Sequence, residues 1–154
     1  MTAPMGGRWF FFYGTLTQDH DNALTRAILP LLVRRQRAFV RGRLLAVRSP
    51  QGWYPVLCAG SGWVAGRLYR AGPRFAARHL RLLDAYEEWD RHRPARSEYR
   101  RLNLRVRVAG GGTVTAQAYR HNRAAHAGLG VIPDGDFGAF VARRGLRAFR
   151  SAQK

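Results

Sequence analysis

The chain is poor in the residues that support disulfide or thiolate chemistry, since Cys58 is the single cysteine among 154 residues. No internal disulfide and no cysteine metal cluster can form. Lysine is almost absent, and Lys154 is the only one. The apolar run from Trp9 to Tyr13 is too short for a signal-peptide core or a membrane span. We therefore expect a cytoplasmic protein with no membrane segment.

Acidic residues are also scarce, and this leaves a strongly basic chain. Nine acids stand against 27 basic residues, so the formal net charge is +18, carried almost entirely by arginine. Such a field attracts nucleic acid and other polyanions. Abundant arginine, alanine and glycine with little lysine is equally the mark of a GC-rich coding sequence. Composition alone therefore does not decide whether the charge has a partner.

The length suits one compact domain over residues 1–154, and a hydrophobic content of 46% is enough for a core. A buried aromatic run, alternating apolar residues, glycine and proline predict elements of both kinds. The expected strands lie at 9–13, 37–47, 62–72 and in a hairpin over 98–120; the expected helices lie within 21–31, at 73–89 and from 134 or 136 onward. Strands and helices do not alternate strictly, so we predict an α+β fold on a curved or barrel-like sheet.

The predicted helix at 73–89 carries the most informative acid. At 100° per residue Glu87 falls inside the apolar arc around Leu83, whereas Glu88 falls outside it. Burial and the negative pole of the helix both disfavour a charged carboxylate there, and a proton-shuttling acid needs that property. The alternative is that Glu87 simply pairs with an arginine.

Other catalytic chemistries have weaker signals. None of the four serines lies in a Gly-x-Ser-x-Gly elbow, and Cys58 resembles a small core residue more than a nucleophile. Asp19, His20 and Asp21 could hold a metal, but no second cluster supports them. The residues alone therefore give only a weak signal for a metal site.

Nucleic-acid binding is the main competing hypothesis. Arginines recur at alternate strand positions and are interleaved with aromatic residues, the pattern of a basic sheet face that stacks bases. The residues concerned are Arg41, Arg43, Arg101, Arg105 and Arg107, with Phe39 and Tyr99. A solvated arginine face is the simpler interpretation.

Short motifs along most of the chain occur in a specific order. They are FFYGTL at 11–16, YP at 54–55, VAGRLY at 64–69, LDAYE at 83–87, YRR at 99–101, VRV and AQAY within 106–119, and DGDF at 134–137. This ordered set resembles the gamma-glutamylcyclotransferase-like family over residues 9–140. No single motif is specific by itself.

The resemblance implies a small mixed β-barrel with flanking helices and neither metal nor cofactor. It implies release of 5-oxoproline from a small gamma-glutamyl amine or peptide, with Glu87 as general acid/base. Main-chain groups of Tyr13, Gly14, Thr15 and Leu16 are expected to hold the glutamyl end. Two further candidates for substrate hydrogen bonds are Tyr99 and Tyr119.

Two departures from the family pattern concern the substrate. Glu88 stands where the family usually has glycine, and the arginine-rich insert at 89–98 follows it. The insert is interpreted either as a lid or basic rim for an anionic partner or as a tolerated surface loop. The alternative function is a non-catalytic basic module of the same fold that binds nucleic acid or another polyanion.

Overall fold

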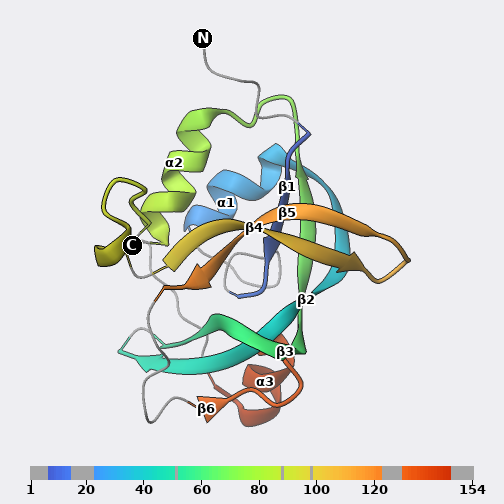
Figure 1. Cartoon of the computed structure of the whole chain (residues 1–154), viewed down its shortest axis with the longest axis vertical. Helices are drawn as coiled ribbons and strands as arrows, with labels where there is room; N and C mark the ends of the chain where they lie inside the picture. Colours follow the sequence, from blue (N-terminus) through green and yellow to red (C-terminus); the bar gives the residue numbers. More distant parts are fainter. Residues whose placement is uncertain are drawn as a thin grey trace.

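A computed structural model describes residues 7–14, 23–50, 52–87, 89–97, 99–122 and 130–146 (Figure 1). The elements, in chain order, are β1 (Trp9–Phe12), α1 (Ala23–Ile28), the 3₁₀ turn η1 (Leu29–Leu31), β2 (Leu32–Ser49), β3 (Gly52–Ala71), α2 (Ala77–Tyr86), the 3₁₀ turn η2 (Pro94–Arg96), β4 (Tyr99–Val108), β5 (Thr113–His121), β6 (Gly130–Val131) and α3 (Phe137–Arg144). None of the helices in this part of the chain combines the length and apolar character needed to cross a bilayer.

Five strands close into a barrel. The sheet runs in the order β3-β1-β5-β4-β2, and β2 pairs back with β3. The β1–β5 pairing is parallel and the other four are antiparallel. In Figure 1 α1 and α2 lie together beside one end of the barrel, and α3 lies at the other. The predicted α+β barrel with flanking helices is confirmed.

Strand β1 is buried on both faces, which explains its run of aromatic residues. Phe11 packs in one cluster with the barrel interior and α3, whereas Phe10 and Phe12 pack in a second cluster that includes Phe75 and Leu83. Successive side chains of a strand point to opposite faces, so consecutive aromatics fill both clusters. The prediction of a fully buried first strand is confirmed.

The helix predicted from Pro73 to Trp89 is shorter than expected. Pro73 lies in a turn, and α2 begins at Ala77 because the His79 side chain accepts the Ala76 N–H at 2.9 Å and caps the first turn. The helix ends at Tyr86, with Glu87 as its C-cap residue. Pro73 therefore belongs to the turn that precedes α2. The prediction that the helix starts at residue 73 was wrong.

The connection between β2 and β3 is short although its sequence, SPQGWYP at 49–55, is typical of a longer turn. Ser49 pairs with Gly52, and Trp53 to Pro55 already pair with β2. Long-range pairing along two strands thus overrides the local turn signal of proline and glycine. The hairpin of β4 and β5, the reversal at residues 110–112 and the Asp136 cap of α3, which accepts the Ala139 N–H at 3.1 Å, are confirmed.

Gly66 lies where β3 crosses close to β1. A Cβ added there would stand 2.4 Å from the Phe12 carbonyl oxygen and 2.6 Å from the Phe11 ring. Backbone and a buried ring can move little, so a methyl group would force the two strands apart.

We expect Gly66→Ala to lower the free energy of unfolding by about 1–3 kcal/mol, because overpacking strains a closed barrel. Gly110→Ala is the matched control, since nothing lies within 4 Å of its added Cβ. Urea unfolding of the two variants measures the difference. Equal midpoints would contradict the close approach of β1 and β3.

Candidate active site

The segment that leaves β1 sits against the start of β3. A Cβ on Gly14 would stand 2.8 Å from Pro55 Cγ, so only glycine allows this approach. The YG and YP motifs are thereby brought together although about forty residues separate them in sequence. Thr15 and Leu16, predicted to hold the glutamyl end with Tyr13 and Gly14, lie outside the described residues.

Tyr13 links this segment to β5. Its hydroxyl donates a hydrogen bond to the Tyr119 carbonyl oxygen at 2.5 Å. Burial is the main reason that the pKa of the Tyr13 phenol is raised well above its ordinary value of 10.0, and the negative charge of Glu87 adds to it. The phenol is therefore a neutral donor at physiological pH and lies within the field of the Glu87 carboxylate.

Glu87 occupies the C-terminal end of α2. It is half-buried, and its N–H donates to the Leu83 carbonyl at 3.0 Å in the last turn. Its charge raises the pKa of both Tyr13 and Tyr119, so the carboxylate lies near two phenols that come from different strands. The acid thus stands at the end of α2, and its charge acts on phenols at the end of β1 and on β5.

A network of charged and polar side chains stands beside Glu87. Arg101 Nε donates to Asp84 Oδ1 at 2.8 Å, and Tyr119 Oη donates to the same oxygen at 2.7 Å. A second guanidinium nitrogen of Arg101 donates to Gln117 Oε1 at 2.7 Å. Both members of the Asp84–Arg101 pair have side chains only 20% exposed. Burial and the Asp84 charge raise the pKa of Tyr119 well above 10.0.

Two other candidate residues take structural positions. Tyr99 is buried, and its hydroxyl donates to the Pro55 carbonyl at 3.2 Å. Cys58 is half-buried on β3; burial raises the pKa of its thiol, while Arg43 and Arg120 act against that. Within the described ranges no three His, Cys, Asp or Glu side chains come together as metal ligands, and Asp19, His20 and Asp21 lie outside them.

A hollow of about 450 Å³ opens beside the end of β1. Tyr13 and Gly14 line one wall, and Arg67 of β3 with Asp136 at the start of α3 line others. Glu87 is not among its lining residues. The hollow therefore lies between the predicted glutamyl-binding segment and the start of α3. Glu87 is the C-cap residue of α2, and α2 lies at the other end of the barrel from α3 (Figure 1).

The arginine-rich insert forms part of a second hollow, of about 510 Å³, against α2. Asp84 and Arg101 lie in this hollow, and Arg91 and His92 of the insert border it. Buried Ser97 holds the insert in shape, because its hydroxyl accepts the Asp90 N–H at 2.9 Å. The insert thus places Arg91 and His92 at the edge of the hollow that holds Asp84, and its role, basic rim or surface loop, stays a prediction.

Comparison with known proteins identifies the family and the fold. The sequence profile of the family described as gamma-glutamyl cyclotransferase, AIG2-like, matches residues 10–139. The chain belongs to this family. No curated protein matches it at the level of sequence.

Several solved structures share the cyclotransferase fold. YkqA from Bacillus subtilis is 18% identical with a TM-score of 0.64; the match covers 90% of this chain but only 42% of YkqA. An AIG2-like protein from Mus musculus is 25% identical, with a TM-score of 0.56 and coverage of 80% and 81%. A structure described as gamma-glutamyl cyclotransferase is 18% identical, with a TM-score of 0.51 and coverage of 75% and 66%. The chain thus spans less than half of YkqA.

Sequence reasoning missed the network around Asp84 in this cyclotransferase-family protein. Asp84 precedes Glu87 by three residues, the spacing that places two helical side chains on one face, so a signal was present. Arg101 gave no such signal, since it alternates with apolar residues like Arg105 and Arg107 do. Only the packing of α2 on β4 distinguishes Arg101 from these exposed arginines.

Replacing Asp84 by asparagine leaves the half-buried Arg101 guanidinium without its charged acceptor. We expect Asp84→Asn to lower the free energy of unfolding by about 1–3 kcal/mol, because a buried charged donor loses its partner. Asp134→Asn is the control: its pair with Arg143 is 2.6 Å long but largely exposed, so the loss should stay below about 1 kcal/mol. Chemical denaturation of both variants tests this, and similar losses would contradict the network.

The two phenols predict a pH dependence of stability. Tyr13 and Tyr119 have raised pKa values in the folded protein, whereas in the unfolded chain they ionise near 10. Their stabilising contribution is complete below pH 10 and is lost as pH rises towards the folded pKa values. Phenolate absorbance should show delayed ionisation in the native protein, and the delayed component should shrink in a Tyr13→Phe, Tyr119→Phe double variant. An unchanged native titration curve in that variant would refute the assignment.

Proposed function

We propose that this protein is a gamma-glutamyl cyclotransferase that releases 5-oxoproline from a gamma-glutamyl amine or peptide, with Glu87 as general acid/base. Membership of the family supports the general activity. The observation that carries the role of Glu87 is its position: a half-buried carboxylate close to Tyr13, at the segment proposed to hold the glutamyl end.

The proposed reaction is an intramolecular aminolysis. The α-amino nitrogen of the glutamyl group attacks its own side-chain carbonyl carbon, closing a five-membered ring, and the bond from that carbon to the leaving nitrogen breaks. Glu87 takes the proton from the attacking amine and passes it to the leaving nitrogen. Nucleophile and electrophile belong to one molecule, so orientation supplies much of the acceleration and the reaction requires no cofactor.

The glutamyl end is proposed to bind along Tyr13, Gly14, Thr15 and Leu16. Main-chain N–H groups at the end of a buried strand are fixed donors for a carboxylate or a developing oxyanion. The close contact of Gly14 with Pro55 supports this, because it holds the backbone there against a rigid ring. Substrate selectivity would then arise from the surfaces around this segment.

Tyr119 and Tyr99 are proposed to help substrate binding mainly by holding neighbouring groups in place. The Tyr119 hydroxyl proton is donated to Asp84 and the Tyr99 proton to the Pro55 carbonyl, so each would meet a substrate chiefly as an acceptor. The Asp84–Arg101 pair supports this by fixing the Tyr119 ring next to Glu87. Loss of the pair should therefore affect catalysis through the placement of Tyr119.

Release of 5-oxoproline from a panel of gamma-glutamyl amines tests the proposal. We expect Glu87→Gln to lower kcat by about 10²–10⁴-fold, because the amide cannot accept and return a proton. Asp134→Asn, a matched substitution at an exposed acid far from β1 in sequence, should retain the wild-type rate.

The unfolding midpoint of Glu87→Gln separates a chemical effect from misfolding. A folded variant with wild-type turnover would exclude Glu87 as the base while leaving the activity in place. Absence of 5-oxoproline from every substrate in the panel, with folded wild-type protein, would reject the cyclotransferase assignment itself.

A further inference from the structure

An outward sheet face gathers arginine and aromatic side chains away from the candidate active site. It is formed where β2, β3 and β4 run side by side, and we call it the Trp63 face. Its residues are Arg37, Phe39 and Arg41 of β2, Trp63 of β3, and Arg105 and Arg107 of β4. These residues alternate with buried ones such as Val40, Val64 and Val106, so their side chains share the outer surface.

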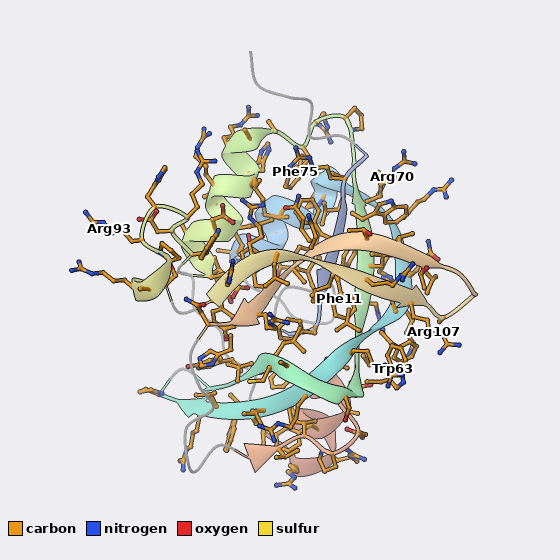
Figure 2. The ribbon with its side chains drawn as sticks, in the orientation of Figure 1. Phe11, Trp63, Arg70, Phe75, Arg93 and Arg107 are labelled. Carbon is orange, nitrogen blue, oxygen red and sulfur yellow. The ribbon has the colours of Figure 1, made fainter. Side chains whose placement is uncertain are left out.

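Trp63 is the centre of this face. Its side chain is exposed, with 38% of the residue accessible, and the Arg41 guanidinium lies over the ring at 4.0 Å from its centroid. Arg107 approaches the same ring at 5.6 Å (Figure 2). Arg41 also donates to the Ser61 carbonyl at 2.8 Å, which fixes its orientation. A large exposed ring thus has two guanidinium groups close to it.

Phe39 repeats the arrangement along β2. The Arg37 guanidinium stands 5.5 Å from the Phe39 ring centroid, and Phe39 pairs across strands with Arg107. Arg37 also meets Asp136 at 3.5 Å, in a pair whose arginine side chain is 52% exposed. An exposed ion pair of this length is a weak interaction, so the positive charge of the arginines dominates the electrostatic potential of the face.

The residues on this face therefore differ from those of the basic face predicted from the sequence. Arg101 turns instead to Asp84 in the core-side network, and Tyr99 is buried. The β2–β3 register shifts between Arg41 and Arg43, so that Arg43 pairs with Cys58 and stands apart from Trp63. What remains from that prediction is Phe39, Arg41, Arg105 and Arg107, joined by Trp63, which the sequence pattern did not include.

We propose that the Trp63 face binds single-stranded nucleic acid. Exposed guanidiniums suit phosphates, and aromatic rings beside them suit unstacked bases, a combination that a duplex cannot fully use. Arg37 to Arg41 spans about 14 Å of extended strand. This length accommodates a short single strand whose bases stack on Phe39 and Trp63 in place of one another.

The experiment is a salt-dependent titration of labelled twelve-nucleotide oligo(U) and oligo(dT) with wild type, Arg41→Gln/Arg107→Gln and Arg93→Gln/Arg96→Gln. The last variant removes the same charge from exposed positions of the insert, and Figure 2 shows Arg93 pointing outward on the opposite side from Trp63. We expect the face variant to weaken binding at least tenfold and to reduce the salt slope by about 1.4, since each neutralised phosphate contributes about 0.7. The insert variant should lose affinity by no more than half of the factor lost by the face variant.

Trp63→Leu provides a second readout that charge cannot mimic. At high salt, where phosphate contacts are screened, loss of the ring should weaken binding by about fivefold or more. Comparison of the two oligonucleotides shows whether the 2′-hydroxyl matters, and either preference is compatible with the proposal.

Three results would overturn it: no binding of either strand at low salt, equal weakening by the face and insert variants, or equal binding of a twelve-base-pair duplex or heparin. Unfolding midpoints verify that each variant is folded. None of these residues belongs to the proposed catalytic machinery, so 5-oxoproline release by the face variant reports on the proposed function independently.

Discussion

The antiparallel pairing of β2 with β3 is the interaction on which the remaining structure depends. It runs from Leu32 opposite Ala71 to Ser49 opposite Gly52 and closes the barrel. The same pairing sets Pro55 where the end of β1 passes and sets Trp63 directly opposite Arg41. Both the candidate active site and the Trp63 face are therefore consequences of one register, and a slip by one residue would invert every side chain in it.

The candidate site contains two of the few acidic residues of this basic protein, and they have different surroundings. Asp84 is engaged by Arg101 and Tyr119, and it thereby satisfies a guanidinium that α2 covers. Glu87, one turn later, lies near two phenols whose raised pKa values keep them neutral. One acid of the motif thus organises charge, while the charge of the next reaches the phenols of Tyr13 and Tyr119.

Much of the fold could be predicted because its signals are local. Consecutive aromatics at 9–13 indicated a strand covered on both faces, and the glycines at 110–112 indicated the reversal of a hairpin. The start of α2 could not be predicted, because its cap is the side chain of His79 and not one of the usual capping residues. The length of β3 could not be predicted either, since Pro55 gives a turn signal that long-range pairing overrides.

The sequence by itself determined the kind and order of the main elements, the family resemblance and the choice of Glu87 as candidate, because periodicity and ordered motifs are properties of the chain alone. Only the tertiary structure decided which arginines are exposed and which form ion pairs. Arg101 and Arg107 alternate alike along β4, yet Arg101 enters a half-buried ion pair while Arg107 reaches an exposed indole. The reason is that alternation fixes the face of a side chain, whereas its environment depends on which distant element packs over that face, α2 in one case and solvent in the other.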